Sequence, residues 1–259
     1  MARPTHAPLG DCMPSGWITP VFGSIAELIV GGETDLNLLT VESLAEMDEA
    51  LTALAGHAGM RALLVRGAGS RAFCAGADLK DLPRRSAAEQ ARFTALGLAV
   101  WSRLSAFPAP TLAVIQGPAF GAGMELALAC DLRLAGPRAR LGQPALRLGL
   151  IPPFAAAGRW RSLIGRGRAN QVLMLGKELD VVTAEAWGII DGVSETLPET
   201  ARAWALRLSE CAPAPVQAWR RWWDTPDPDA EAAYLTGRLS EAEPDQDWVR
   251  QAKKPAKSE

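Results

Sequence analysis

Residues 117–136, GPAFGAGMELALACDLRLAG, carry the clearest structural signal in the chain. They follow TLAVI at 111–115, an apolar run typical of a buried strand. The glycines and the alanine- and leucine-rich segment behind them predict a tight turn that opens into a helix from about Ala122 to Cys130. LRLA at 132–135 then predicts a strand. A strand, a helix and a strand in this order indicate a βα repeat and a largely parallel sheet.

The same alternation continues upstream of this segment. Strands are expected at 24–30 and 62–65, and Val41 begins an amphipathic helix that Thr40 caps. A longer helix is expected from about Ser86 to Ser105, because prolines follow it. The sequence therefore predicts an α/β fold.

Beyond Gly165 the pattern becomes helical. Helices are expected at about 169–175, 184–187 and 198–211, followed by two amphipathic helices and a polar tail. We therefore divide the chain into a flexible leader at 1–20, an α/β core at 21–197 and a helical C-terminal region at 198–259.

Composition and charge exclude several classes of function. The chain has 259 residues and a net charge of −2, which gives no basic surface for a nucleic-acid backbone. No apolar run reaches the roughly 18 residues that a membrane span needs. The N-terminal segment lacks a signal-peptide pattern, and the cysteines show no CxxC spacing. We expect a cytoplasmic protein with free thiols and with no nucleic-acid or membrane partner.

A second loop rich in small residues, FCAGADL at 73–79, also follows a buried strand. Small residues allow a ligand to approach the backbone closely. The alternative is a plain turn between a strand and a helix, with Gly76 at positive φ and Asp78 as the helix cap.

The loop at 117–125 offers more chemistry. A helix start presents unpaired N–H groups and the positive end of a dipole, which suits a developing oxyanion. Glu125 falls one turn after Ala122 on the same face, so its carboxylate is expected near whatever the Ala122 N–H binds. The alternative is a glutamate that the dipole alone favours. Leu126 stands where a dinucleotide fingerprint needs glycine.

Together, the two loops and the continuation LGQPALRLGLIP at 141–152 resemble the crotonase family, also called enoyl-CoA hydratase/isomerase. The resemblance runs from about Asn37 to Val193, and RALLVRGAGSRAFCAGADL at 61–79 is part of it. It implies a crotonase-like spiral of ββα and βαβ turns with a helical C-terminal trimerisation region. It also implies homotrimers, often paired into hexamers, with no metal and no cofactor, since an acyl-CoA thioester is the substrate.

The resemblance also implies roles for residues. The N–H groups of Ala77 and Ala122 would form an oxyanion hole for the thioester carbonyl, and Glu125 would transfer protons. Losing one such donor typically costs about 10²–10³ in rate. The residues expected at the substrate are Ala75, Gly76, Ala77, Asp78, Leu79, Gly121, Ala122, Ala145 and Phe154.

One departure concerns the chemistry. Hydratases of the family use two glutamates, and the second aligns with Ala145; no Asp or Glu lies between Arg138 and Val172 to replace it. Phe154 stands in a loop that is glycine-rich in the family, which would reshape the acyl pocket. The sequence predicts an acyl-CoA-processing enzyme of enoyl-CoA hydratase or isomerase type with a single glutamate. An acyl-CoA decarboxylase or thioester hydrolase, and a catalytically degenerate acyl-CoA-binding protein, stay open as alternatives.

Overall fold

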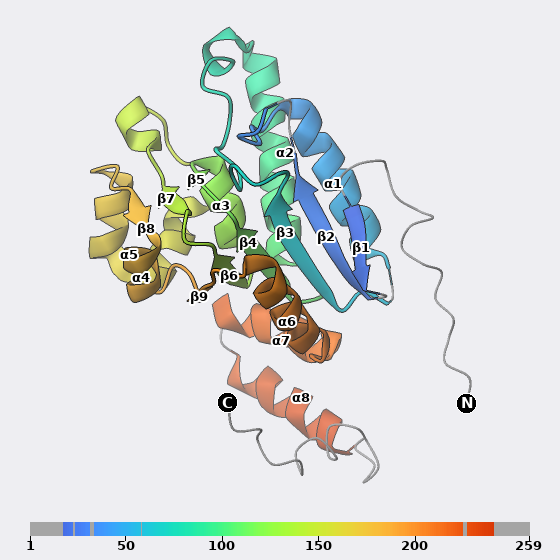
Figure 1. Ribbon diagram of the computed structural model, residues 1–259. Helices are drawn as coiled ribbons and strands as arrows, with labels where there is room; N and C mark the ends of the chain where they lie inside the picture. The colour runs from blue at the N-terminus through green and yellow to red at the C-terminus, as the bar shows by residue number, and fades with distance from the viewer. Residues whose placement is uncertain (1–17, 23, 32–33, 58, 225–226, 241–259) are drawn as a thin grey trace. The chain divides into compact units, whose positions relative to one another are not determined.

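The computed structural model describes residues 18–22, 24–31, 34–57, 59–224 and 227–240 (Figure 1). Its strands are β1 (Ile18–Phe22), β2 (Ile25–Val30), β3 (Ala62–Gly67), β4 (Thr111–Ile115), β5 (Ala119–Phe120), β6 (Leu132–Ala135), β7 (Arg140–Gly142), β8 (Leu179–Asp180) and β9 (Gly192–Val193). Its α-helices are α1 (Val41–Ala55), α2 (Ala87–Ser105), α3 (Ala122–Ala129), α4 (Ala156–Leu173), α5 (Val181–Ala186), α6 (Leu197–Ser209), α7 (Pro213–Asp224) and α8 (Pro228–Ser240), with short 3₁₀ turns η2 (Leu82–Arg84) and η3 (Ala145–Leu148).

The main sheet has six strands in the order β1-β2-β3-β4-β6-β9. Only β1 pairs antiparallel, with β2, and the remaining pairs are parallel. The predicted α/β fold with a largely parallel sheet is thereby confirmed.

Alternate side chains of each central strand enter different cores. In β3, Leu63 and Val65 pack in the cluster that includes α1 and α2, whereas Leu64 packs in a second cluster with Leu197 and Ala201 of α6. Figure 1 shows α1 and α2 on one face of the sheet and α6 on the other. Both faces are covered, which explains why these strands are apolar throughout instead of alternating with polar residues.

A second row of pairing accompanies the main sheet. The segment after each main strand forms a short extended piece: Leu39 bridges Ala77, Cys74 bridges Ala119, and β5 pairs with β7. β8 closes this row antiparallel to β7. Each turn of chain thus contributes one strand to the main sheet, one short extended piece and one helix, which is the predicted spiral of ββα turns.

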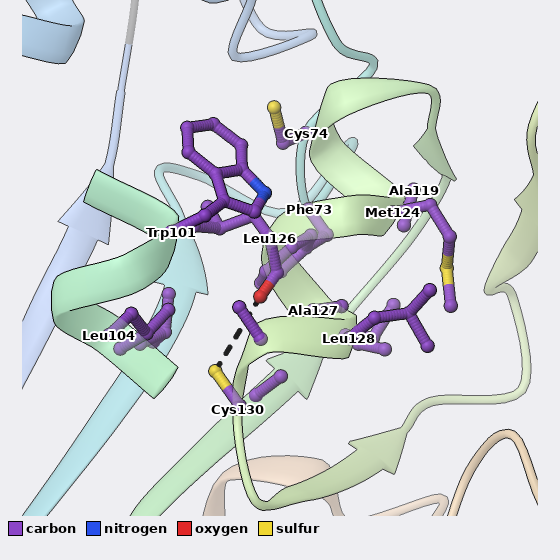
Figure 2. Packing of buried hydrophobic residues seen from close by; sticks show 14 of the residues in the cluster. Phe73, Cys74, Trp101, Leu104, Ala119, Met124, Leu126, Ala127, Leu128 and Cys130 are labelled. Atoms are coloured by element: carbon purple, nitrogen blue, oxygen red, sulfur yellow. Dashed lines mark hydrogen bonds between the residues drawn. The ribbon is translucent and has the colours of Figure 1, made fainter. Parts of the chain in front are cut away.

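Local sequence sets the ends of the helices. Thr40 and Ser86 each form a capping box with the third helical residue, so both predicted helix starts are confirmed. Figure 2 shows Trp101 and Leu104 of α2 beside Leu126 of α3 in the core. This packing fixes α3, the helix that begins at the candidate site.

One predicted boundary, the end of the leader, needs correction. Residues 18–20, assigned to the leader, belong to β1, which pairs with the free edge of β2; residues 1–17 lie outside the described part of the chain. As an edge strand, β1 tolerates Pro20. The predicted helical region from 198 starts within one residue of α6, whose apolar face packs on the sheet; the division of the chain at this point stays a prediction. α4 has two helical parts that meet at a kink at Gly165, where φ is positive, and the helix expected from 169 is its second part.

The chain divides into two compact units, the first ending at Gln217 and the second beginning at Ala218. Within the second unit, Trp222 meets Tyr234 of α8 edge-on, with ring centroids 5.6 Å apart. No helix in the described ranges is both long and apolar enough to cross a bilayer.

Candidate active site

A buried asparagine holds the first small-residue loop in place. Asn37 adopts a positive φ of 53°, and its Nδ2 donates to the carbonyl oxygens of Ala68, Ala72 and Phe73 at 3.1, 2.9 and 3.2 Å. Asparagine tolerates this backbone conformation better than most residues. The loop after β3 is therefore pinned by its backbone rather than by its own small side chains.

The second loop lies directly against the first. Cys74 bridges Ala119, and the Phe120 N–H donates to the Cys74 carbonyl oxygen at 3.0 Å. A methyl group on Gly123 would collide with that same carbonyl. Glycine at 123 is therefore required for the first turn of α3 to approach the loop, a close contact that only a residue without Cβ permits.

The two predicted donor amides occupy equivalent places in successive turns of the spiral. Ala77 follows Cys74 by three residues, and Ala122 follows Ala119 by three. A methyl on Gly76, whose φ is +92°, would lie 3.3 Å from the Ala122 nitrogen. Neighbouring loops thus bring the two amides into the same region.

Neither amide is engaged elsewhere within the described ranges. No hydrogen bond there uses the N–H of Ala77 or of Ala122. Ala122 is the first residue of α3, so its N–H has no partner inside the helix and lies at the positive end of the helix dipole. Both groups are available to an anionic or carbonyl oxygen.

Glu125 lies one turn into α3, with 1% of its surface exposed. Its Oε1 accepts from Gln143 Nε2 at 2.6 Å, and its Oε2 accepts from the Phe154 N–H at 3.0 Å. Burial raises the pKa of Glu125 from 4.5 to about 7, although both hydrogen bonds and the positive charge of Arg159 act to lower it. A carboxyl with this pKa both accepts and releases a proton near neutral pH.

A cavity of about 750 Å³ joins these groups. Among the described residues it is lined by Ala75, Gly76, Ala77, Leu79, Leu82, Pro83, Gln90, Phe93, Thr94, Phe120, Gly121, Ala122, Glu125, Gln143, Pro144, Ala145, Leu148, Leu150, Ile151, Pro153 and Phe154. Glu125 is the one carboxylate in this lining. The size and the mostly apolar wall suit a small organic ligand.

Nearly all of the predicted site residues border this cavity. Asp78 does not: its Oδ1 accepts from the Lys80 N–H at 2.8 Å, in the turn before η2. Ala145 borders the cavity as a small apolar surface.

Two functional neighbours of Glu125 escaped the sequence reasoning. Gln143 holds the carboxylate, and its buried Oε1 has no partner within the described ranges. The sequence offered one signal for Gln143: it is a polar residue next to Gly142 in a mostly apolar stretch. Arg159 lies a turn into α4 and nothing in its local sequence connects it to Glu125.

Comparison with known proteins agrees with this architecture. The family model for enoyl-CoA hydratase/isomerase matches residues 23–247. A short-chain-enoyl-CoA hydratase from Clostridium acetobutylicum is 32% identical over 197 residues, or 75% of this chain and 76% of that protein. A crotonyl-CoA hydratase from Syntrophomonas wolfei is 34% identical over 178 residues, or 68% of each.

Solved structures agree as well. The crystal structure of an enoyl-CoA hydratase from Bacillus anthracis matches with a TM-score of 0.76 at 28% identity, covering 80% of this chain and 81% of that one. The strand order and the matching structures identify the fold as a crotonase-type α/β spiral, and the cavity lies between its loops. The chain belongs to the enoyl-CoA hydratase/isomerase family.

Proposed function

We propose that this chain is an enoyl-CoA hydratase or isomerase that binds a thioester carbonyl with the amides of Ala77 and Ala122 and transfers protons with Glu125. One observation carries the proposal: a single cavity unites two uncommitted amides with one buried carboxylate. The names of the related hydratases support an acyl-CoA substrate.

The amides act on charge that develops during the reaction. When water adds to the β-carbon of an enoyl thioester, electrons move to the carbonyl oxygen and an enolate forms. Two N–H donors at a helix start and a neighbouring loop stabilise that negative oxygen more than the neutral carbonyl. The acceleration comes from this difference.

In the proposed mechanism, Glu125 alone makes both proton transfers. As a carboxylate it removes one proton from water while the oxygen bonds to the β-carbon, and as an acid it then returns that proton to the α-carbon. For an isomerase it takes a proton from one carbon and delivers it two carbons away. The pKa of about 7 leaves both forms of the carboxyl accessible near neutral pH.

Replacing Glu125 by glutamine tests the proposal. Turnover of 2-enoyl and 3-enoyl thioesters should fall by about 10²–10⁴. Binding of a saturated acyl-CoA should persist, because the amides remain. Unchanged turnover of a substrate that the wild type converts well would remove the role of Glu125.

A second candidate reaction is favoured by Ala145. Decarboxylation of a malonyl-type thioester needs an enolate-stabilising site, and a second carboxylate near the leaving carboxylate would repel it. Ala145 gives the cavity an uncharged surface where the family's second glutamate would stand. Release of CO₂ from malonyl-type thioesters, with no hydration of enoyl thioesters, would favour this candidate over the first. Hydrolysis of the thioester is checked in the same assay by free-thiol release.

We also propose a cytoplasmic enzyme that assembles as a homotrimer or hexamer, with acyl-CoA as its small-molecule partner and no further cofactor. The family resemblance supports the assembly and the acyl-CoA substrate, and the lack of a signal-peptide pattern in the N-terminal segment supports the cytoplasmic location. Light scattering on the purified chain measures the assembly directly, and a monomer at working concentration would contradict it.

A further inference from the structure

The cavity has an open side and a closed side. Its apolar residues Leu148 and Ile151 are 49% and 82% exposed, whereas Phe93 and Phe154 are 4% and 1% exposed. The exposed residues mark the mouth, and the buried phenylalanines form the inner wall. Glu125, with 1% exposed, lies at the inner end with them.

The Phe154 ring occupies a space that α2 leaves open for it. It stacks on Trp101 with centroids 4.5 Å apart and lies 6.3 Å from the Phe93 ring. A methyl on Gly97 would overlap the Phe154 ring atoms Cε1 and Cζ. Glycine inside a helix is unfavourable, so its presence at the contact indicates that the ring's position matters.

The backbone of Phe154 is also fixed beside the carboxylate. Its N–H donates to Glu125 Oε2 at 3.0 Å, and its carbonyl accepts from Arg159 Nη1. Arg159 Nη2 in turn donates to Ser105 Oγ of α2 at 2.8 Å. The ring therefore stands at a set distance from the residue proposed to transfer protons.

We propose that the Phe154 ring, seated on Gly97, is the stop that limits the acyl chain, and that the site takes short-chain acyl thioesters. This inference rests on the proposed function. A thioester whose carbonyl contacts the two amides places its α- and β-carbons near Glu125. A tail that continues past Glu125 meets the ring, behind which Trp101 and α2 leave no room.

Paired substitutions test the stop in opposite directions. Phe154→Ala removes it, while Gly97→Ala forces the ring toward the cavity. The measurements are the dissociation constants of a saturated acyl-CoA series of increasing length and kcat/KM for the matching 2-enoyl-CoA series. Each buried methylene is worth about 0.8 kcal/mol, or about fourfold in affinity.

The wild type should gain affinity with length only until the tail reaches the ring. Phe154→Ala should extend the gain by about two methylenes, or about 15-fold in the preference for longer over shorter chains. Gly97→Ala should shorten the limit. Phe154→Leu, a milder change, should give an intermediate limit and covers the case in which Phe154→Ala does not fold.

Phe107→Leu is the matched control, because Phe107 is a buried aromatic that does not border the cavity; its length profile should equal that of the wild type. Acyl-CoA binding with the same length profile in the wild type, Phe154→Ala and Phe154→Leu would overturn the stop while leaving the proposed function standing. Failure of the folded wild type to bind or convert any acyl-CoA would overturn the proposed function and the stop with it.

Discussion

Replacing Glu125 by glutamine keeps the shape of the side chain and removes its charge. The carboxylate accepts from two donors, Gln143 Nε2 and the Phe154 N–H, so a glutamine amide nitrogen would face one of them. Gln143 relieves this conflict by turning its own amide, because its buried Oε1 has no partner in the described part of the chain. We therefore expect the variant to fold.

The stability of the two proteins should diverge with pH. The folded state keeps the Glu125 proton between pH 4.5 and about 7, where the unfolded chain has lost it. Wild-type stability therefore carries a contribution that is complete below pH 4.5 and is lost as pH rises through 7. At about 1.4 kcal/mol per pKa unit, the stability difference between variant and wild type should change by about 3 kcal/mol across this window, in favour of the variant at high pH.

Denaturant unfolding at a series of pH values measures this directly, alongside turnover of enoyl thioesters. Wild-type kcat/KM for hydration should fall as pH drops through about 7, because Glu125, the proposed general base, becomes protonated. The variant should lose about 10²–10⁴ in rate. Parallel stability profiles for the two proteins would refute the raised pKa, and equal rates would refute the catalytic role.

Substitutions at three other positions address the donors and their support. Ala122→Pro, tolerated at a first helical position, should lower kcat by about 10²–10³ in steady-state assays, whereas Ala122→Gly, which keeps the N–H, should stay near the wild type. Arg159→Gln removes a positive charge that lowers the pKa of Glu125, so the acid limb of the rate profile should move to higher pH; a limb that stays or moves down contradicts this. Asn37→Ala removes the side-chain donor of the Ala68 and Phe73 carbonyls, while the Ala72 carbonyl keeps Gln116 Nε2 at 2.8 Å, and should cost about 1–3 kcal/mol in chemical denaturation.

Long periodic segments made much of the fold predictable. The helices that begin after Thr40 and Ser86 carry caps and an apolar stripe, and TLAVI reads as a buried strand at its observed bounds. The two-residue strands β5, β8 and β9 carry no period of their own. They exist because neighbouring turns of the spiral pair with them, which local sequence does not encode.

The sequence also did not predict which surface each amphipathic helix packs against. The amphipathic pattern of α6 shows that it buries one face but does not say which surface covers it, so the helix was grouped with α7 and α8. Its apolar face includes the small residues Ala201 and Ala205, which pack in the same cluster as the sheet residues Leu64 and Leu112.

Within the site, the two loops and the helix start could be predicted, because glycines, small residues and one glutamate lie close together in the sequence there. The roles of Ala77, Ala122 and Glu125 stay predictions. Interactions across long sequence separations, such as the hydrogen bond from Gln143 and the charge of Arg159 near the carboxylate, depend on how α4 and the loop before it return to α3.

The carbonyl stretching frequency of an isotope-labelled acyl-CoA thioester bound to the protein reports directly on the two amides. If the N–H groups of Ala77 and Ala122 both donate to the thioester oxygen, the frequency in the wild-type complex lies clearly below its value in water, and it returns toward that value in Ala122→Pro but not in Ala122→Gly. A bound wild-type carbonyl that vibrates as it does in water would contradict the assignment of these amides.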